Sequence, residues 1–264
     1  MGLTQADIKR LKQLLQKKHR QEQGLLLIEG LRLVREALTS RVDILEVYHT
    51  RDFEESQPGS LLLEKLSGKA GKLVPVTPRE LDAFTDTVHA QGIAAVVRFK
   101  TVLPDTLLNT RGSPVVVVAI DAISDPGNLG SMIRTCDWFG VSGMVLGRNS
   151  VELLNPKVVR GTMGSIFHLP IAEEAELLAF LSTAKESGFS LYVTDVHGEA
   201  HFDHVQYADR SIIVFGNEAW GVSDQVLQLA DTRVTIRRYG SAESLNVGVA
   251  CGVVLSAIHR LRHA

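Results

Sequence analysis

Residues 114–136, PVVVVAIDAISDPGNLGSMIRTC, contain the pattern that most clearly indicates the fold class. It opens on a run of valines that continues apolar to Ile120, a pattern typical of a strand buried on both faces of a parallel sheet. The Asp-Pro-Gly sequence that follows predicts a turn, and Asn128 is placed to cap the next helix. A buried strand, a turn and a helix in this order indicate an α/β fold.

The alternation of strand and helix continues to the end of the chain. After the first strand, we expect strands near residues 143–147, 165–170, 190–196, 211–216 and 232–238. We expect helices over residues 128–139, 174–187, 223–230 and 245–261. The sequence therefore predicts, for residues 114–264, a mostly parallel sheet with helices on both faces.

A second, smaller α/β unit is predicted before this region. Strand-like runs at 25–30, 42–50, 72–77 and 92–100 alternate with helical runs at 31–38, 60–68 and 78–86. The residues between the two units read TVLPDTLLNTRGS, a mainly polar sequence with a proline and a glycine that indicates a linker. We therefore divide the chain into a domain at 1–100, a linker at 101–113 and a domain at 114–264.

The basic residues gather at the front of the chain. The net charge of the whole chain is −2, but residues 1–113 hold 17 Lys and Arg against 14 Asp and Glu, whereas residues 114–264 hold 11 against 16. The densest run is KRLKQLLQKKHR, which is either a solvated helix face, as most charge runs are, or a stripe that contacts nucleic-acid phosphates. Its basic residues are Lys9, Arg10, Lys12, Lys17, Lys18 and Arg20.

The apolar runs, the N-terminus and the two cysteines indicate the cellular location of the protein. No apolar run reaches the ~18 residues that span a bilayer, and the N-terminus does not resemble a signal peptide. Cys136 and Cys251 form no Cys-x-x-Cys pair and are expected to be buried thiols. The sequence therefore predicts a cytoplasmic protein with no membrane segment.

The loops that follow the predicted strands are the places to look for a site, because open parallel sheets bind ligands beyond the carboxyl ends of their strands. The first such loop, at 121–136, puts a helix N-terminus at the sheet edge, where it can bind an anion. Arg134 lies about two turns into that helix. It either makes a rim ion pair, with Asp125 or Asp137, or contacts a ligand.

Two more loops carry unusual residues. In VFGNEAWGVSDQVL (214–227), Gly216 would allow the backbone to approach a ligand closely. In TIRRYGSAESLNVGVACGVVL (235–255), glycines disfavour the helix, so we expect it to pack closely against the chain's own sheet or against another subunit. Ser244 and Asn246 stand at its start, either as caps or as ligand contacts. Neither dinucleotide nor P-loop glycine patterns occur.

Taken in order, DPGNLGSMIRT, GNEAWG and SLNVGVA resemble the three motifs of the SpoU/TrmH family of RNA ribose methyltransferases, and the match spans residues 114–264. LLLIEGLRLVREAL and QGIAAVV resemble the substrate-binding α/β domain of that family, which is similar to small ribosomal proteins. The resemblance implies a C-terminal trefoil knot, an S-adenosylmethionine cofactor, a homodimer, RNA as the partner and no metal.

The resemblance also implies which residues form the site. The catalytic residues are expected to be Asn128, Arg134, Glu218, Ser244 and Asn246. The cofactor-binding residues are expected to be Thr194, Gly216, Asn217, Ile236 and Leu245. Two positions depart from the family pattern: Ala219 stands where glycine is usual, and Gly248 where serine or alanine is usual.

The reaction that the resemblance implies is methyl transfer from the sulfonium of S-adenosylmethionine to a ribose 2'-hydroxyl. The enzyme must align the hydroxyl and make it more nucleophilic. Because arginine holds its proton with a reference pKa above about 12, we expect Arg134 to stabilise developing oxyanion charge or to clamp a phosphate. Removal of the proton is then shared with water or with Glu218.

Three other interpretations stay open. HGEAHFDH, residues 197–204, offers histidines and carboxylates for zinc, but it lacks the His-Glu-x-x-His pattern and fits a polar surface loop better. The chain could also be a non-catalytic RNA-binding or ribosome-assembly protein that keeps the fold. The preference for ribosomal RNA over transfer RNA rests on analogy with the N-terminal domain alone.

Overall fold

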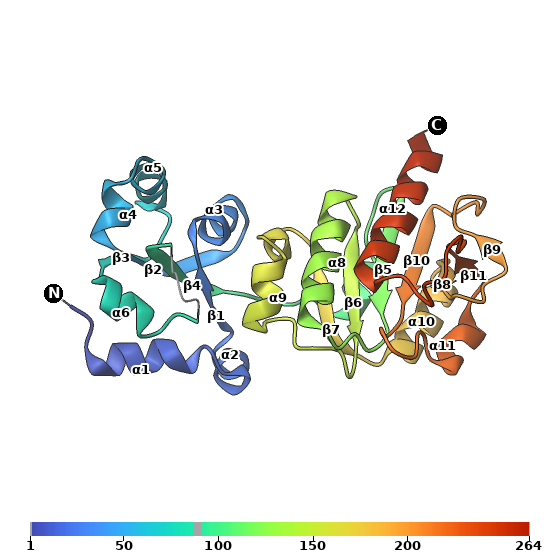
Figure 1. Ribbon diagram of the computed structural model, residues 1–264, viewed down its shortest axis with the longest axis horizontal. Helices are drawn as coiled ribbons and strands as arrows, with labels where there is room; N and C mark the ends of the chain where they lie inside the picture. The colour runs from blue at the N-terminus through green and yellow to red at the C-terminus, as the bar shows by residue number, and fades with distance from the viewer. Residues whose placement is uncertain (1, 87–90, 264) are drawn as a thin grey trace. The chain divides into compact units, whose positions relative to one another are not determined.

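The computed structural model describes residues 2–86 and 91–263. They form two compact units, each with its own sheet (Figure 1). Unit 1 takes in the chain up to Lys100 together with Leu154–Phe167, and unit 2 takes in Thr101–Leu153 and His168–Ala264. Unit 1 therefore receives a segment that lies within the predicted C-terminal domain.

Unit 1 is built on a four-stranded sheet in the order β1-β4-β2-β3. The central strand β4 (Ile93–Arg98) runs antiparallel to both β1 (Leu25–Glu29) and β2 (Asp43–His49), and β3 (Lys72–Pro75) runs parallel to β2. Every residue of β4 except Arg98 is buried, as its central position requires.

Short helices surround this sheet. The helices are α1 (Gln5–Gln13), α2 (Lys17–Gln23), α3 (Leu31–Thr39), α4 (Arg51–Glu55), α5 (Gln57–Leu66), α6 (Pro78–Asp82), α9 (Pro156–Gly161) and the 3-10 helix η1 (Ser165–Phe167). A capping box between Thr4 and Asp7 starts α1. Leu11 and Leu14 then enter the core of the unit with Phe84, so Lys9 and Lys12 are held on the outside of the helix.

Unit 2 is built on a seven-stranded sheet in the order β7-β6-β5-β10-β8-β11-β9, in which all neighbouring strands are parallel. The strands are β5 (Val115–Ile120), β6 (Gly143–Gly147), β7 (Ile171–Ala175), β8 (Ser190–Thr194), β9 (Ala200–His201), β10 (Arg210–Phe215) and β11 (Thr232–Thr235). The predicted parallel sheet is confirmed.

Helices cover both faces of this sheet. The helices are α7 (Pro104–Leu108), α8 (Pro126–Trp138), α10 (Leu177–Glu186), α11 (Asp224–Leu229) and α12 (Val247–His263). Val115, Val117 and Ala119 alternate into a core shared with residues of α7, α10 and α11. On the other face, α8 and α12 lie side by side in Figure 1 and are in contact.

Two segments differ from what their sequence patterns indicated. Residues 165–170 were expected to form a strand, which is wrong: Met163 and Gly164 have left-handed φ angles of 54° and 103°, and the turn they make leads into η1. The strand starts only at Ile171. The segment expected to be a linker, 101–113, contains α7, whose Leu107 and Leu108 are buried in the core of unit 2. None of the described helices is both long and apolar enough to cross a bilayer.

Candidate active site

The loop after β5 forms the first wall of the site. Asp125, not Asn128, is the N-cap of α8: its Oδ1 accepts a hydrogen bond of 2.8 Å from the Asn128 backbone N–H. Pro126 explains this shift, because proline suits the first helical position and the residue before it then becomes the cap. Asn128 therefore lies in the first turn of the helix, with its side chain available for other contacts.

The loop after β10 forms the second wall, and Asn217 holds it in place. The backbone N–H of Asn217 donates to the Gly221 carbonyl at 2.8 Å, and that of Gly221 donates back at 3.0 Å. The buried Asn217 side chain donates to the Ala122 carbonyl at 2.5 Å and to Ser124 Oγ at 2.9 Å. The second motif is therefore tied to the first through an amide side chain.

Gly216 is required by this loop itself. A Cβ at Gly216 would lie 2.2 Å from the Gly221 carbonyl carbon and 2.3 Å from the Val222 nitrogen. The close approach that we expected between this glycine and a ligand is thus already made by the chain's own backbone. Any side chain here would displace the loop.

Glu218 reaches across from this loop to the start of α8. Its carboxylate accepts hydrogen bonds from the backbone N–H of Ser124 at 3.2 Å, from that of Asp125 at 3.1 Å and from Asn128 Nδ2 at 3.0 Å. Partial burial alone would raise the pKa of Glu218, but these hydrogen bonds to the ionised form outweigh it and lower the pKa. A carboxylate held in this way is a poor proton acceptor.

Asn246 brings the third motif to the same place. Its Nδ2 donates a hydrogen bond of 2.8 Å to Asn128 Oδ1. Its Oδ1 accepts the backbone N–H of Gly248 at 2.9 Å and that of Val249 at 3.2 Å, and so caps α12. Asn246 is therefore both a cap and a site residue, and Glu218, Asn128 and Asn246 form one hydrogen-bonded row.

Arg134 and Ser244 stand apart from this row. Both side chains are exposed. Across residues 2–86 and 91–263, the Arg134 guanidinium makes no ion pair or hydrogen bond, so the rim ion pair with Asp125 or Asp137 is not present there. Among the side chains that the structure describes, no carboxylate pairs with the Arg134 guanidinium on α8.

The residues expected at the cofactor lie at the carboxyl ends of three neighbouring strands. Thr194 ends β8 and donates from Oγ1 to the Val214 carbonyl at 2.9 Å, and Gly216 follows β10. Ile236 follows β11 and is half-buried, while the Leu245 side chain is 51% exposed. Apolar side chains without cover beside strand ends fit a ligand with an apolar ring, such as the adenine of S-adenosylmethionine.

Packing of α12 against α8 accounts for the small residues of the third motif. A Cβ at Gly248 would lie 3.2 Å from Ser131 Oγ, and one at Gly252 would lie 3.8 Å from Thr135 Cγ2. Cys136 is buried, and this burial is the main reason why the pKa of its thiol is raised. A hydrogen bond with Cys251 raises that pKa further. We expected this helix to pack closely on the chain's own sheet or on another subunit; within the chain its close contact is with the helix α8 instead.

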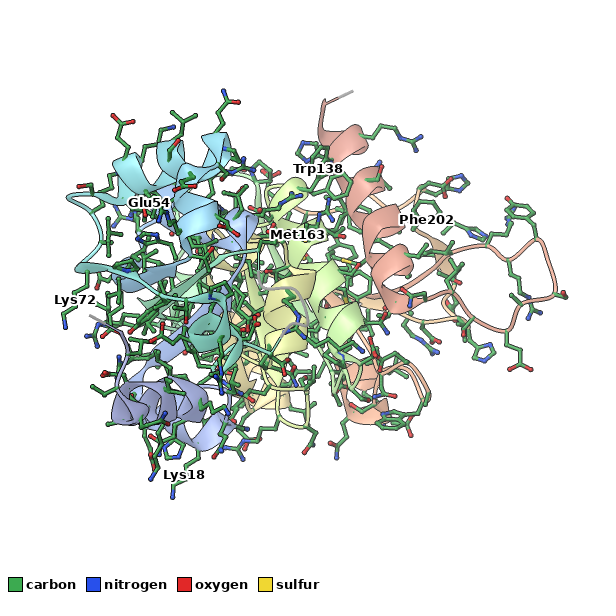
Figure 2. The ribbon with its side chains drawn as sticks, turned by 60° about the vertical axis from the view of Figure 1, so that its left-hand side comes forward. Lys18, Glu54, Lys72, Trp138, Met163 and Phe202 are labelled. Atoms are coloured by element: carbon green, nitrogen blue, oxygen red, sulfur yellow. The ribbon has the colours of Figure 1, made fainter. Side chains whose placement is uncertain are left out.

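The basic run at the front of unit 1 divides by role. Lys9 and Lys12 line a groove of about 380 Å³ together with His19. Arg10 instead pairs with Glu46 at 2.7 Å, and the buried Arg20 donates to the Leu14 carbonyl at 3.0 Å. Figure 2 shows the Lys18 side chain extending outward from α2, where it lies 3.9 Å from a Glu22 oxygen. Lys17 begins α2.

The histidines at 197–204 show no metal-binding geometry. In the part of the chain that the structure describes, no group of three or more His, Cys, Asp or Glu side chains could hold a metal ion. Arg237 Nη2 lies 2.9 Å from His201 Nε2, and Arg233 Nε donates to Asp195 at 2.9 Å.

Sequence reasoning missed Ser124 and Asp125 as parts of the site. Their backbone N–H groups hold Glu218, and Ser124 Oγ accepts from Asn217. The Asp-Pro pair at 125–126 was the signal that could have placed the cap.

Comparisons with known proteins agree with the three-motif resemblance. Residues 115–256 match the model of the SpoU rRNA Methylase family, and residues 5–95 match that of the MRM3-like substrate binding domain. The chain is 34% identical over 251 residues to the 23S rRNA (guanosine(2553)-2'-O)-methyltransferase RlmP of Bacillus subtilis, covering 94% of each.

Two solved structures are similar over nearly the whole chain. The AdoMet-bound rRNA methyltransferase from Sinorhizobium meliloti has a TM-score of 0.86 and 27% identity, covering 99% of this chain and 97% of that one. The SpoU methyltransferase AviRb from Streptomyces viridochromogenes, in complex with AdoMet, has a TM-score of 0.87 and 25% identity, covering 99% of both.

Proposed function

The chain belongs to the SpoU rRNA Methylase family, and on that premise we propose that it transfers a methyl group from S-adenosylmethionine to a ribose 2'-hydroxyl of ribosomal RNA. It is an S-adenosylmethionine-dependent RNA methyltransferase by family. The observation that carries the proposal is the row of Glu218, Asn128 and Asn246, which joins all three motifs through hydrogen bonds of 3.0 and 2.8 Å.

The residues of the chain divide the work of the reaction. When bound, S-adenosylmethionine supplies a methyl group with its own leaving group. Asn128 has its amide oriented by Glu218 on one side and by Asn246 on the other, so it offers a fixed surface for the ribose. Arg134 carries a positive charge that stabilises the developing oxyanion or clamps the adjoining phosphate.

Glu218 is a positioning residue in this proposal. Its lowered pKa and its hydrogen bonds to the start of α8 argue against a role as general base. The proton of the ribose hydroxyl then goes to water. We also propose Ser244, an exposed hydroxyl two residues before Asn246, as a hydrogen-bonding partner of the substrate.

We place the cofactor at the carboxyl ends of β8, β10 and β11. Ile236 and Leu245 supply apolar contacts, and the backbone at Gly216 supplies polar ones. Thr194 and Asn217 stabilise the backbone around the site and do not contact the cofactor through their side-chain donors, because these donors are already bonded to the Val214 and Ala122 carbonyls. Ala219 donates its backbone N–H to Asn217 Oδ1, so the departure from glycine there is accommodated within the loop.

Unit 1 is proposed to bind the RNA. Its match to a substrate-binding domain model supports this role, as do the exposed lysines of α1 and α2. Lys9, Lys12, Lys17 and Lys18 are the candidates for phosphate contacts because their side chains are exposed, whereas Arg10 is half-buried against Glu46 and Arg20 is buried. The proposed rRNA substrate also supports a cytoplasmic location for the protein.

We propose that the chain forms a homodimer through the exposed surfaces of α8 and α12. Trp138, at the end of α8 and labelled in Figure 2, is 84% exposed, and Val249 on α12 is 53% exposed. Large apolar side chains on neighbouring helices are typical of interfaces. Sedimentation equilibrium at micromolar concentration should give twice the chain mass, and Trp138→Glu should give one chain mass; a monomeric wild type would refute the dimer.

The trefoil knot is proposed on the family's precedent. β11 lies three positions from β5 in the sheet order. The chain after β11 nevertheless comes back to the loop that follows β5, where Asn246 bonds to Asn128, and this return supports the proposal. Pulling the ends apart in a single-molecule experiment would leave a knotted chain shorter than its full contour length.

The test of the main proposal is methyl transfer to defined RNA. Purified protein with labelled S-adenosylmethionine should methylate an unmodified large-subunit rRNA transcript, and nuclease mapping should find a 2'-O-methyl group. Label in transfer RNA alone would overturn the choice of substrate. If calorimetry detected no S-adenosylmethionine binding at near-millimolar cofactor, the alternative of a non-catalytic RNA-binding protein would stand instead.

A further inference from the structure

We propose that the loop at 236–243, which we call the Arg-Tyr loop, binds an unpaired nucleotide of the RNA beside the reactive ribose. The phenol ring of Tyr239 stacks on the base, and Arg237 and Arg238 bind the flanking phosphates. The inference rests on the proposed function, because it requires RNA at this end of the sheet.

The exposure of the loop is the first observation. The Tyr239 side chain is 88% exposed, and both arginines beside it are exposed as well. A single exposed aromatic residue has no meaning by itself. An exposed ring directly beside two arginines, however, is the combination with which proteins bind single-stranded RNA, since every base has a face that can stack and every nucleotide carries a phosphate.

The charge of the surrounding region is the second observation. Residues 114–264 hold 11 Lys and Arg against 16 Asp and Glu, and Arg237–Arg238 is the only place in that stretch where two Lys or Arg residues are adjacent. A polyanion approaching an acidic region is held only where the charge is locally positive. The Arg-Tyr loop is such a place.

The partners of the two arginines are the third observation. Arg237 Nη2 lies 2.9 Å from the imidazole nitrogen Nε2 of His201. Arg238 Nη1 donates to the Ala242 carbonyl at 3.5 Å. In the described parts of the chain, no carboxylate pairs with either, in contrast to Arg233, which pairs with Asp195. The contacts of both guanidinium groups are thus with an imidazole and a backbone carbonyl and not with carboxylates, which leaves their positive charge for RNA phosphates.

The position of the loop is the fourth observation. It follows β11 directly, and it leads into Asn246, whose side chain is bonded to Asn128 in the site. Asn246 is seven positions after Tyr239, so their Cα atoms are at most about 25 Å apart. This separation is short enough for the nucleotide on Tyr239 to be a near neighbour of the target nucleotide.

The experiment measures RNA binding without turnover. Full-length protein is titrated with an unmodified large-subunit rRNA transcript in the presence of S-adenosylhomocysteine, for wild type, Tyr239→Ala, Tyr239→Phe, and Arg237→Ala with Arg238→Ala. Arg148→Ala is the matched control, because Arg148 is an exposed arginine of the same unit that already pairs with Glu176. Thermal unfolding checks that each variant is folded.

Loss of the ring should weaken RNA binding roughly 5- to 100-fold, the range that one lost stacking contact produces, while Tyr239→Phe and the control bind as wild type. Loss of the two arginines should lower the slope of log affinity against log salt by about 1.4. Ultraviolet crosslinking should place an RNA adduct on Tyr239.

Unchanged RNA affinity and salt slope in both variants would overturn the proposal. So would variants that lose S-adenosylhomocysteine affinity or dissociate a dimer while binding RNA normally, because the loop would then be a cofactor or subunit contact. If the wild type bound RNA but transferred no methyl group, the proposed function would be contradicted. The binding measurements would still test whether the Arg-Tyr loop contacts RNA.

Discussion

Asn246 donates a hydrogen bond of 2.8 Å from its side-chain amide to that of Asn128, although 118 residues separate them in the chain. Asn128 passes the contact on, because its Nδ2 donates to Glu218 at 3.0 Å. An amide that donates with one end and accepts with the other links the loops after β5, β10 and β11 into one arrangement. Four predictions test what this arrangement does.

Replacement of Asn128 by alanine should remove both contacts at once. We expect kcat to fall roughly 100-fold, the scale of a misplaced site, and the free energy of unfolding to fall by about 1 kcal/mol. Rapid-quench kinetics and denaturant unfolding measure the two. Asn109→Ala is the control, because Asn109 is an exposed asparagine whose amide bonds only to the nearby Asp105 carbonyl. If Asn128→Ala kept full activity, the row would be structural only.

Replacement of Arg134 should affect the reaction and not the fold. Since Arg134 has no partner in the described residues, Arg134→Ala should leave the melting temperature within experimental error. The rate at saturating S-adenosylmethionine should fall roughly 100- to 1000-fold, the cost of one lost charge-stabilising group. Arg134→Lys should recover little of that loss, because lysine lacks the planar fork of arginine. Full turnover with lysine would refute the clamp.

Glu218 should make stability depend on pH in the acid range. Its pKa is lowered below the ordinary value of 4.5 in the folded protein, so its stabilising contribution is present above that value and is lost as the pH falls through the folded pKa. Glu218→Gln cannot lose a proton-linked contribution. The difference in melting temperature between wild type and Glu218→Gln should therefore shrink as the pH is lowered from 6 to about 3. A constant difference would contradict the lowered pKa.

Replacement of Gly216 should disturb the loop of the second motif. The Cβ of alanine would lie 2.2 Å from the Gly221 carbonyl carbon, so the backbone must move, at a cost of about 1–3 kcal/mol in the free energy of unfolding. Methyl transfer should fall with it, since Glu218 is carried on the displaced loop. Gly240→Ala is the control for stability, because a Cβ there meets nothing within 4 Å. If Gly216→Ala and Gly240→Ala had the same free energy of unfolding, the predicted clash at Gly216 would be refuted.

Much of the fold could be predicted because it depends on local patterns. The valines of β5 indicated a strand buried on both faces, and β6 has the bounds that its apolar run predicted, Gly143–Gly147. The failures came where a few residues override the pattern. Residues 165–170 look like a strand, but the left-handed turn at Met163 and Gly164 leads them into a 3-10 helix instead. Likewise Pro126 moved the cap of α8 from Asn128 to Asp125.

The sequence by itself determined the α/β fold of both units and, through the order of three motifs, the family, since residue types and their spacing are readable along the chain. Through the same motifs it also predicted Asn128, Glu218 and Asn246 as site residues. Only the tertiary structure decided that these three bond to one another, that Glu218 is held ionised at the start of α8, and that Gly216 makes room for the chain's own backbone. The hydrogen bonds of Asn128 to Glu218 and Asn246 join residues 90 and 118 positions apart, so their geometry depends on how the parallel strands are ordered in the sheet. The close approach at Gly216 is local, but it depends on the exact path of the loop from Gly216 to Val222, which residue types do not specify.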